Sequence, residues 1–115
     1  MAKDSSQEEA LTALRREFAD ALPARLEVLR VALNRLRERV TRDDLRAFHL
    51  PAHALAGTAG SYEARELVPH AARLSTLARR WIDAGTAPAS ELDEASRELD
   101  ALDAATERFR RRTQG

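Results

Sequence analysis

The stretch LEVLRVALNRLRERV, residues 26–40, decides the fold class of this 115-residue chain. Its large apolar residues return at alternating spacings of three and four, at Leu26, Leu29, Leu33, Leu36 and Val40. That spacing places them on one face of an α-helix, and arginine and glutamate occupy much of the rest. The stretch therefore predicts an amphipathic helix that packs one face against a core.

The same spacing recurs in four further segments of the chain. Each segment carries one apolar stripe, and none shows the alternation of period two that a half-buried strand requires. The stripes are Leu11, Leu14, Phe18 and Leu22; Leu45, Phe48, Ala52, Leu55, Ala59 and Tyr62; Leu67, Ala71, Leu74, Ala78 and Trp81; and Leu92, Ala95, Leu99, Leu102, Thr106 and Phe109. We therefore expect an all-α protein of five helices.

Helix-ending and helix-capping residues separate the segments. The Ser6–Glu9 spacing is that of a capping box, Pro23 is expected to end the first helix, and Thr41 is expected to cap the third. The run 84–88 contains Gly85 and Pro88, which mark the last break. The chain length suits one domain, so residues 1–115 are predicted to form a single domain. Its short connections favour antiparallel packing of neighbouring helices. It is an antiparallel four-helix bundle, with bundle helices at about 24–112 and an additional N-terminal helix.

Composition excludes several functional classes. Lys+Arg and Asp+Glu number 19 each, so net charge gives no general attraction to nucleic acid. The chain has no cysteine, which excludes disulfides and thiol chemistry. No apolar run approaches the ~20 residues of a membrane span, and no signal peptide is visible at the N-terminus. We expect a cytoplasmic, monomeric protein that binds neither nucleic acid nor membrane.

The stretch AFHLPAHALAGTAGSY, residues 47–62, concentrates residues that a simple core helix does not need. At about 100° per residue, His53 falls roughly 130° from the centre of the apolar stripe and is predicted to face solvent. Arg46, His49, Leu50, Ala56, Gly57 and Gly60 are placed on its face by the same count. The glycines reduce helix propensity by about 1 kcal/mol each relative to alanine, yet they clear the surroundings of the imidazole.

This arrangement favours a nucleophile on a docking surface. A solvent-exposed imidazole has an ordinary pKa near ~6.5, so its neutral, nucleophilic form is present at neutral pH. Leu50 is a large apolar residue on the same face, and Arg46 is a candidate cation for a phosphoryl group. We expect a partner protein to dock over Leu50, Ala56, Gly57 and Gly60 and to bring a reactive group to His53.

The run His53-Ala54-Leu55-Ala56-Gly57 resembles the core motif of histidine phosphotransfer (HPt) domains, a His with a Leu two residues on and a Gly four on. The resemblance covers residues 44–78. It includes the small residues at 58–61 and the Glu66-Leu67, Ala71 and Leu74 of the next helix. Many HPt domains have Lys at the position of Ala56, and a subset has a small residue there.

The resemblance implies a phosphorelay intermediate with a four-helix bundle fold. His53 would be the phosphoacceptor between two receiver-domain aspartates, and Gly57 would clear the approach to it. The implied partners are a response-regulator receiver domain, a hybrid histidine kinase, or both. The Mg²⁺ required for transfer would be bound by the receiver, so no cofactor is expected in this chain. Residues 57–60 contain no lysine and follow a helix, so they do not form an ATP-binding loop, and no kinase activity is expected.

The sequence also permits other interpretations of the histidines, the prolines and the function. His53 and His49 have the i, i+4 spacing of a metal-binding pair, with His70 as a possible third ligand, but no carboxylate sits at a diagnostic offset. Pro51 and Pro69 fall inside expected helices and are expected to kink or interrupt them. The chain is alternatively a helical adaptor that binds a receiver or kinase domain without phosphoryl transfer.

Overall fold

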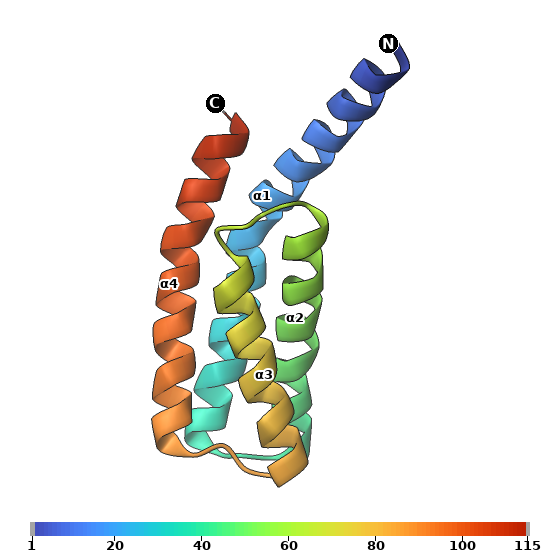
Figure 1. The fold of residues 1–115 in the computed structure, drawn as a ribbon. Helices are drawn as coiled ribbons and strands as arrows, with labels where there is room; N and C mark the ends of the chain where they lie inside the picture. The colour runs from blue at the N-terminus through green and yellow to red at the C-terminus, as the bar shows by residue number, and fades with distance from the viewer. Residues whose placement is uncertain (1, 115) are drawn as a thin grey trace.

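A computed structural model describes residues 2–114, with side chains described from Ser5 onward. Its described part contains four helices and no strand: α1 (Ala2–Glu38), α2 (Arg42–Ser61), α3 (Val68–Ala84) and α4 (Ala89–Gln114). Each helix runs antiparallel to the preceding one (Figure 1). Helix α1 packs against α2 and α4, and α3 packs against the same two helices. The predicted all-α antiparallel four-helix bundle is confirmed.

The additional N-terminal helix is not a separate element, and the prediction of five helices is wrong. Pro23 lies inside α1, which continues unbroken into the bundle. Phe18 and Leu22 are already buried before the proline, and the Phe18 ring lies 6.0 Å from that of Phe109 on α4. Because Pro23 removes only one backbone hydrogen bond donor, packing on both sides of it keeps the helix continuous.

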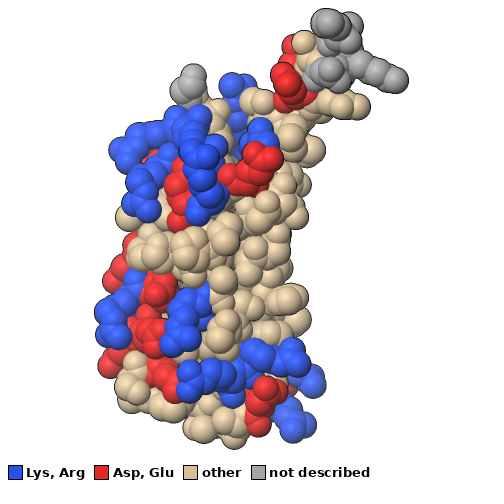
Figure 2. All heavy atoms as spheres, viewed as in Figure 1, with Lys and Arg blue, Asp and Glu red and all other residues tan. Residues whose placement is uncertain are grey.

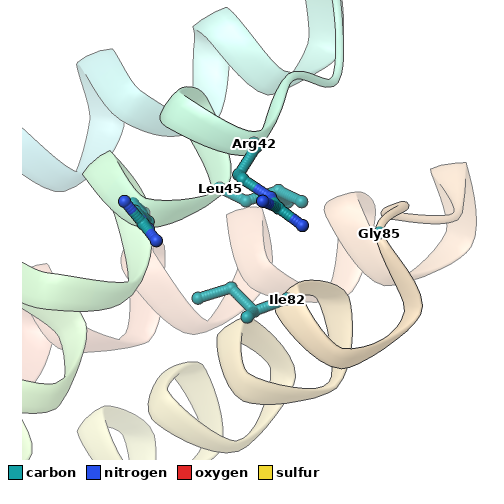
Figure 3. A pocket seen from close by; sticks show the side chains of 5 residues that line it. Arg42, Leu45, Ile82 and Gly85 are labelled. Atoms are coloured by element: carbon teal, nitrogen blue, oxygen red, sulfur yellow. The ribbon is translucent and has the colours of Figure 1, made fainter.

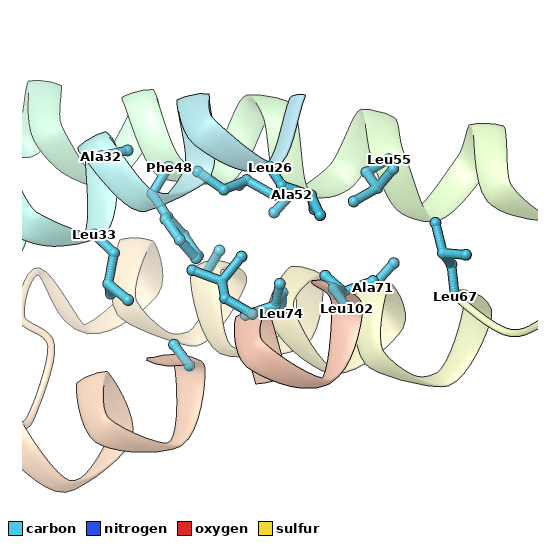
Figure 4. Packing of buried hydrophobic residues seen from close by; sticks show 14 of the residues in the cluster. Leu26, Ala32, Leu33, Phe48, Ala52, Leu55, Leu67, Ala71, Leu74 and Leu102 are labelled. Carbon is cyan, nitrogen blue, oxygen red and sulfur yellow. The ribbon is translucent and has the colours of Figure 1, made fainter. Parts of the chain in front are cut away.

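The apolar stripes meet in one core along the bundle axis. Figure 4 shows side chains from α1, α2, α3 and α4 interdigitating there. The predicted stripes of α2, α3 and α4 are buried apart from Tyr62, which is half-buried beside the Phe18 ring. Of the stripes predicted for residues 11–40, Leu14 is exposed and is wrong as a core position, Leu11 is half-buried, and Val40 is half-buried against the core after the end of α1.

Local sequence signals set most of the helix ends. Thr41 caps α2 by accepting a hydrogen bond from the Asp44 backbone N–H at 3.1 Å, as predicted. Gly85 ends α3 in the left-handed conformation, at φ 71°. Pro69 does not interrupt a helix, because it lies in the first turn of α3, where its missing N–H has no intrahelical partner to lose. Ser6 is not a cap, since α1 already includes it.

Ion pairs join α4 to the remaining elements. Arg112 binds both carboxylate oxygens of Glu66 at 2.8 and 2.9 Å, which ties the last turns of α4 to the loop between α2 and α3. Arg73 of α3 forms a forked pair with Glu94 of α4.

No described helix is long and apolar enough to cross a membrane.

Candidate functional site

Helix α2 presents His53 on its solvent face. The helix continues from Arg42 to Ser61 through Pro51, so of the two expected effects of this proline, a kink or an interruption, the interruption does not occur. Proline at this position leaves the Ala47 carbonyl without its helical donor, and Ala47 is exposed to water. Residues on both sides of Pro51 therefore share one helical register, and His53 is exposed, as predicted.

The surface C-terminal to His53 is open. Gly57 and Gly60 are both exposed, and a Cβ added to either would meet no atom within 4 Å. Packing therefore does not explain the absence of a side chain at these positions. The glycines expose helix backbone next to His53, and this geometry permits close approach of another molecule.

Apolar residues lie N-terminal to His53 and on the neighbouring helix. Leu50 is 66% exposed, one turn before His53. Ala47 borders a groove of about 320 Å³ that α1 lines with Val28 and Val31, which are 54% and 44% exposed. Exposed apolar side chains gathered in this way are typical of interaction surfaces. Ala47, Val28 and Val31 line this groove, whereas Leu50 lines a separate hollow between α2 and α3. We call these four residues, which flank α2, the apolar patch.

Basic residues line the edge between α2 and α3. Arg42, Leu45 and Arg46 of α2 form a hollow of about 500 Å³ with Ile82 and Gly85 (Figure 3). A neighbouring hollow of about 480 Å³ is lined by Arg46, His49, Leu50, Arg79, Ile82 and Asp83.

Charge is distributed unevenly along α2. No Lys, Arg, Asp or Glu occurs between residues 47 and 62, and Figure 2 shows charged side chains gathered near both ends of the bundle with an uncharged region between them. Arg46 precedes this stretch, and Arg79 approaches its edge from α3. His53 thus lies on an uncharged surface with arginines on one side.

His49 lies half-buried in the second hollow, beside His53. The two imidazole rings are stacked, with centroids 5.7 Å apart and planes 26° from parallel. Burial lowers the pKa of His49, and the positive charges of His53 and Arg79 lower it further, whereas Asp83 opposes them. The neutral imidazole of His49 is therefore favoured.

His70 belongs to a different part of the molecule. It is half-buried, and its Nδ1 lies 2.7 Å from Oε2 of Glu98 on α4. This contact directs His70 toward α4 rather than toward His49 and His53. Residues 2–114 contain no group of three or more metal-binding side chains.

The structure shows one predicted docking residue to be less exposed than expected and reveals further side chains on the surfaces of α1 and α3 beside α2. Ala56 is half-buried and packs against the core, so it is less exposed than the angular count predicted. Arg79, Val28 and Val31 were missed by the sequence analysis. The sequence places Val28 and Val31 outside the apolar stripe of α1, and this position could have predicted that both valines are exposed. The choice between Arg79 and its neighbour Arg80 required the packing of α3.

Comparison of the chain with protein-family models agrees with the geometry of this site. The family model described as Hpt domain matches residues 13–111, which include all of α2 and α3, most of α1 and α4, and the entire His53 surface. No curated protein and no solved structure shows a significant match to the chain. Since the matched region spans most of its length, the chain belongs to the Hpt domain family, whose members take part in histidine phosphotransfer in phosphorelays.

Proposed function

We propose that this chain relays a phosphoryl group between receiver-domain aspartates through His53. The observation that carries the proposal is the exposed imidazole of His53 on a continuous helix, next to two glycines at which even a Cβ would meet no neighbour. A nucleophile in this setting is accessible to a group that another protein presents. The open surface matters because reacting atoms must approach to about 3–3.5 Å.

In the proposed reaction an unprotonated ring nitrogen of His53 attacks the phosphorus of a receiver aspartyl phosphate. The N–P bond forms with the nitrogen lone pair, while the P–O bond breaks and its electron pair remains on the aspartate carboxylate. Transfer to a second receiver reverses these steps. Phosphoryl transfer depends mainly on positioning and on charge stabilisation, and we propose that the receiver brings the aspartate and a bound Mg²⁺.

Two surfaces support docking of the receiver. The apolar patch offers area to bury, and Arg46 and Arg79 offer positive charge beside the His53 surface. Leu50, Arg46, Gly57, Gly60 and the half-buried Ala56 are proposed as docking residues. The apolar contacts supply affinity, whereas exposed arginines act mainly on the rate and orientation of encounter.

The proposal is tested by incubating the chain with receiver domains from its own genome, each phosphorylated with radiolabelled acetyl phosphate and freed of excess reagent. We expect the label to move from at least one receiver to this chain within seconds to minutes. Receivers that bind without transferring label would support the alternative, a bundle adaptor, and would contradict the relay.

We expect Leu50→Ala to weaken binding of the phosphate-donating receiver about tenfold, or ~1.4 kcal/mol, because it removes exposed apolar area at the centre of the proposed interface. Its stability should change by less than about 0.5 kcal/mol, since the side chain is 66% exposed. Isothermal titration calorimetry and thermal unfolding measure the two effects. The control is Leu74→Ala, which removes a fully buried side chain and should reduce the free energy of unfolding by about 2–5 kcal/mol. Strong destabilisation by Leu50→Ala would remove Leu50 from the docking surface.

We expect Arg46→Ala to slow association with the receiver about 3- to 10-fold at low salt and to flatten its salt dependence, because an exposed charge acts at encounter. Stopped-flow association rates over a range of ionic strength provide the measurement. Arg108→Ala is the matched control: it removes the same charge from an exposed position on α4, a helix that does not pack against α2. Equal effects of the two substitutions would show that only net charge matters.

A further inference from the structure

A second imidazole lies against the proposed phosphoacceptor. His49 precedes His53 by one helical turn, and the stacked rings have centroids 5.7 Å apart. His53 is exposed, whereas His49 is half-buried in the hollow between α2 and α3. A phosphoryl group bonded to the His53 ring would therefore lie within about a Debye length, ~8–10 Å, of His49.

The charged groups around His49 set its protonation in the unphosphorylated chain. Besides His53, the hollow is lined by Arg46 of α2 and by Arg79 and Asp83 of α3. Burial lowers the pKa of His49, and the charges of His53 and Arg79 act in the same direction. Asp83 raises this pKa, but its carboxylate also pairs with Arg79 at 3.7 Å. His49 is accordingly neutral at neutral pH before phosphorylation.

Phosphorylation of His53 changes the sign of the nearest charge. The phosphoryl group brings up to two negative charges to the His53 ring. In the unphosphorylated chain, by contrast, a protonated His53 ring opposes protonation of His49. We propose that His49 is a positioning residue that takes up a proton when His53 becomes phosphorylated, and that its imidazolium then stabilises the phosphorylated state. This inference rests on the proposed function only in taking His53 as the phosphorylated residue.

The proton balance of this step is simple. One proton passes from solvent to the unprotonated nitrogen of His49 as the phosphoryl group arrives, and it returns to solvent when the group leaves. No bond of the phosphohistidine is broken by the uptake. Because linkage is reciprocal, protonation of His49 favours the phosphorylated state by the factor that phosphorylation favours protonation. This advantage is complete below the pKa of His49 in the free chain and is lost as the pH rises through the higher pKa of the phosphorylated chain.

The direct test is a pH titration of the histidine ring signals by ¹H–¹⁵N NMR, before and after phosphorylation of the full chain with potassium phosphoramidate. We expect the pKa of His49 to rise by about 0.5–1 unit on phosphorylation of His53. The ring of His70, which pairs with Glu98 at 2.7 Å, is the internal control and should titrate identically in both states. A change at His49 no larger than that at His70 would overturn the inference.

Two substitutions separate charge from packing. His49→Gln cannot take up the proton, and His49→Lys carries a fixed positive charge. We expect the equilibrium for phosphoryl transfer from a receiver to favour wild type over His49→Gln by about 3- to 10-fold near pH 6, with the ratio falling toward one by about pH 8. His49→Lys should keep its advantage over His49→Gln throughout this range. Identical pH profiles for all three proteins would contradict the role of His49.

The outcomes distinguish this inference from the proposed function. If phosphoramidate labels His53 and the His49 titration does not move, the inference fails while the relay through His53 stands. If His49 responds as expected but no receiver transfers its label to the chain, the inference holds as chemistry of the His53 surface and the proposed relay fails.

Discussion

We expect His53→Gln to eliminate phosphoryl labelling of this chain by a phosphorylated receiver, with a loss of at least about 10³-fold in transfer rate. The substitution removes the only proposed nucleophile, and glutamine's amide nitrogen has no available lone pair for attack at phosphorus. The fold should be unaffected, since His53 is exposed and glutamine is a good helix former. Radiolabel transfer and far-ultraviolet circular dichroism measure the two expectations.

Controls for this substitution come from the remaining histidines. His49→Gln and His70→Gln should both retain the label, although the first should change its pH dependence. The label on wild type should be acid-labile and stable in alkali, as expected for a phosphoramidate and not for an acyl phosphate. Retention of label by His53→Gln, together with its loss from His49→Gln, would move the phosphoacceptor to His49.

We expect Gly57→Arg to slow phosphoryl transfer about 100-fold or more while the bundle remains folded. A long side chain one turn from His53 would occupy the space that the receiver needs, and a displacement of about 1 Å at the reacting atoms is enough for an effect of this size. Stability should be unchanged or higher by up to about 1 kcal/mol, because glycine is a poor helix residue and a Cβ at position 57 meets no atom within 4 Å. Stopped-flow transfer rates and thermal unfolding provide the measurements.

Two further variants at the same position separate bulk from charge and helix propensity. Gly57→Ala adds only a methyl group and should transfer faster than Gly57→Arg, with the same gain in helix propensity. Gly57→Gln has a long side chain without charge and should be slowed strongly. Unfolding of Gly57→Arg would contradict the open geometry of this surface, and normal transfer by it would show that the receiver does not approach over Gly57.

Much of the fold could be predicted because apolar spacing directly reports which helix face is buried. The stripes through Leu29, Phe48, Leu74 and Leu99 lie in the core, apart from the half-buried Val40 and Tyr62 at their ends. The number of helices could not be predicted from proline alone. Pro23 and Pro51 each remove one donor, and neighbouring core residues such as Leu22 and Ala52 hold the helix together across that loss. Local propensity is overridden here by tertiary packing.

The site was predictable as far as it depends on one helix. Angular counting along α2 correctly placed His53, Leu50, Gly57 and Gly60 on the exposed face. It was less accurate for Ala56, which is half-buried against the core.

Angular counting along α2 cannot predict which residues of other helices lie beside it. Arg79 of α3 lines a hollow with His49 and Leu50, and Val28 and Val31 of α1 line a groove with Ala47, only through the arrangement of the bundle. The stacking of His49 on His53 depends on side-chain conformations, which the i, i+4 spacing permits but does not determine.

The central claim is that His53 receives a phosphoryl group from a receiver aspartate. The most direct measurement mixes the ¹⁵N-labelled chain with each phosphorylated receiver domain of its genome and follows the ring signals of all three histidines by ¹H–¹⁵N NMR. We predict that at least one receiver produces the large ring ¹⁵N shifts of a phosphohistidine at His53, with no phosphorylation at His49 or His70. Phosphorylation at another residue, or unmodified His53 with every phosphorylated receiver, would contradict the account.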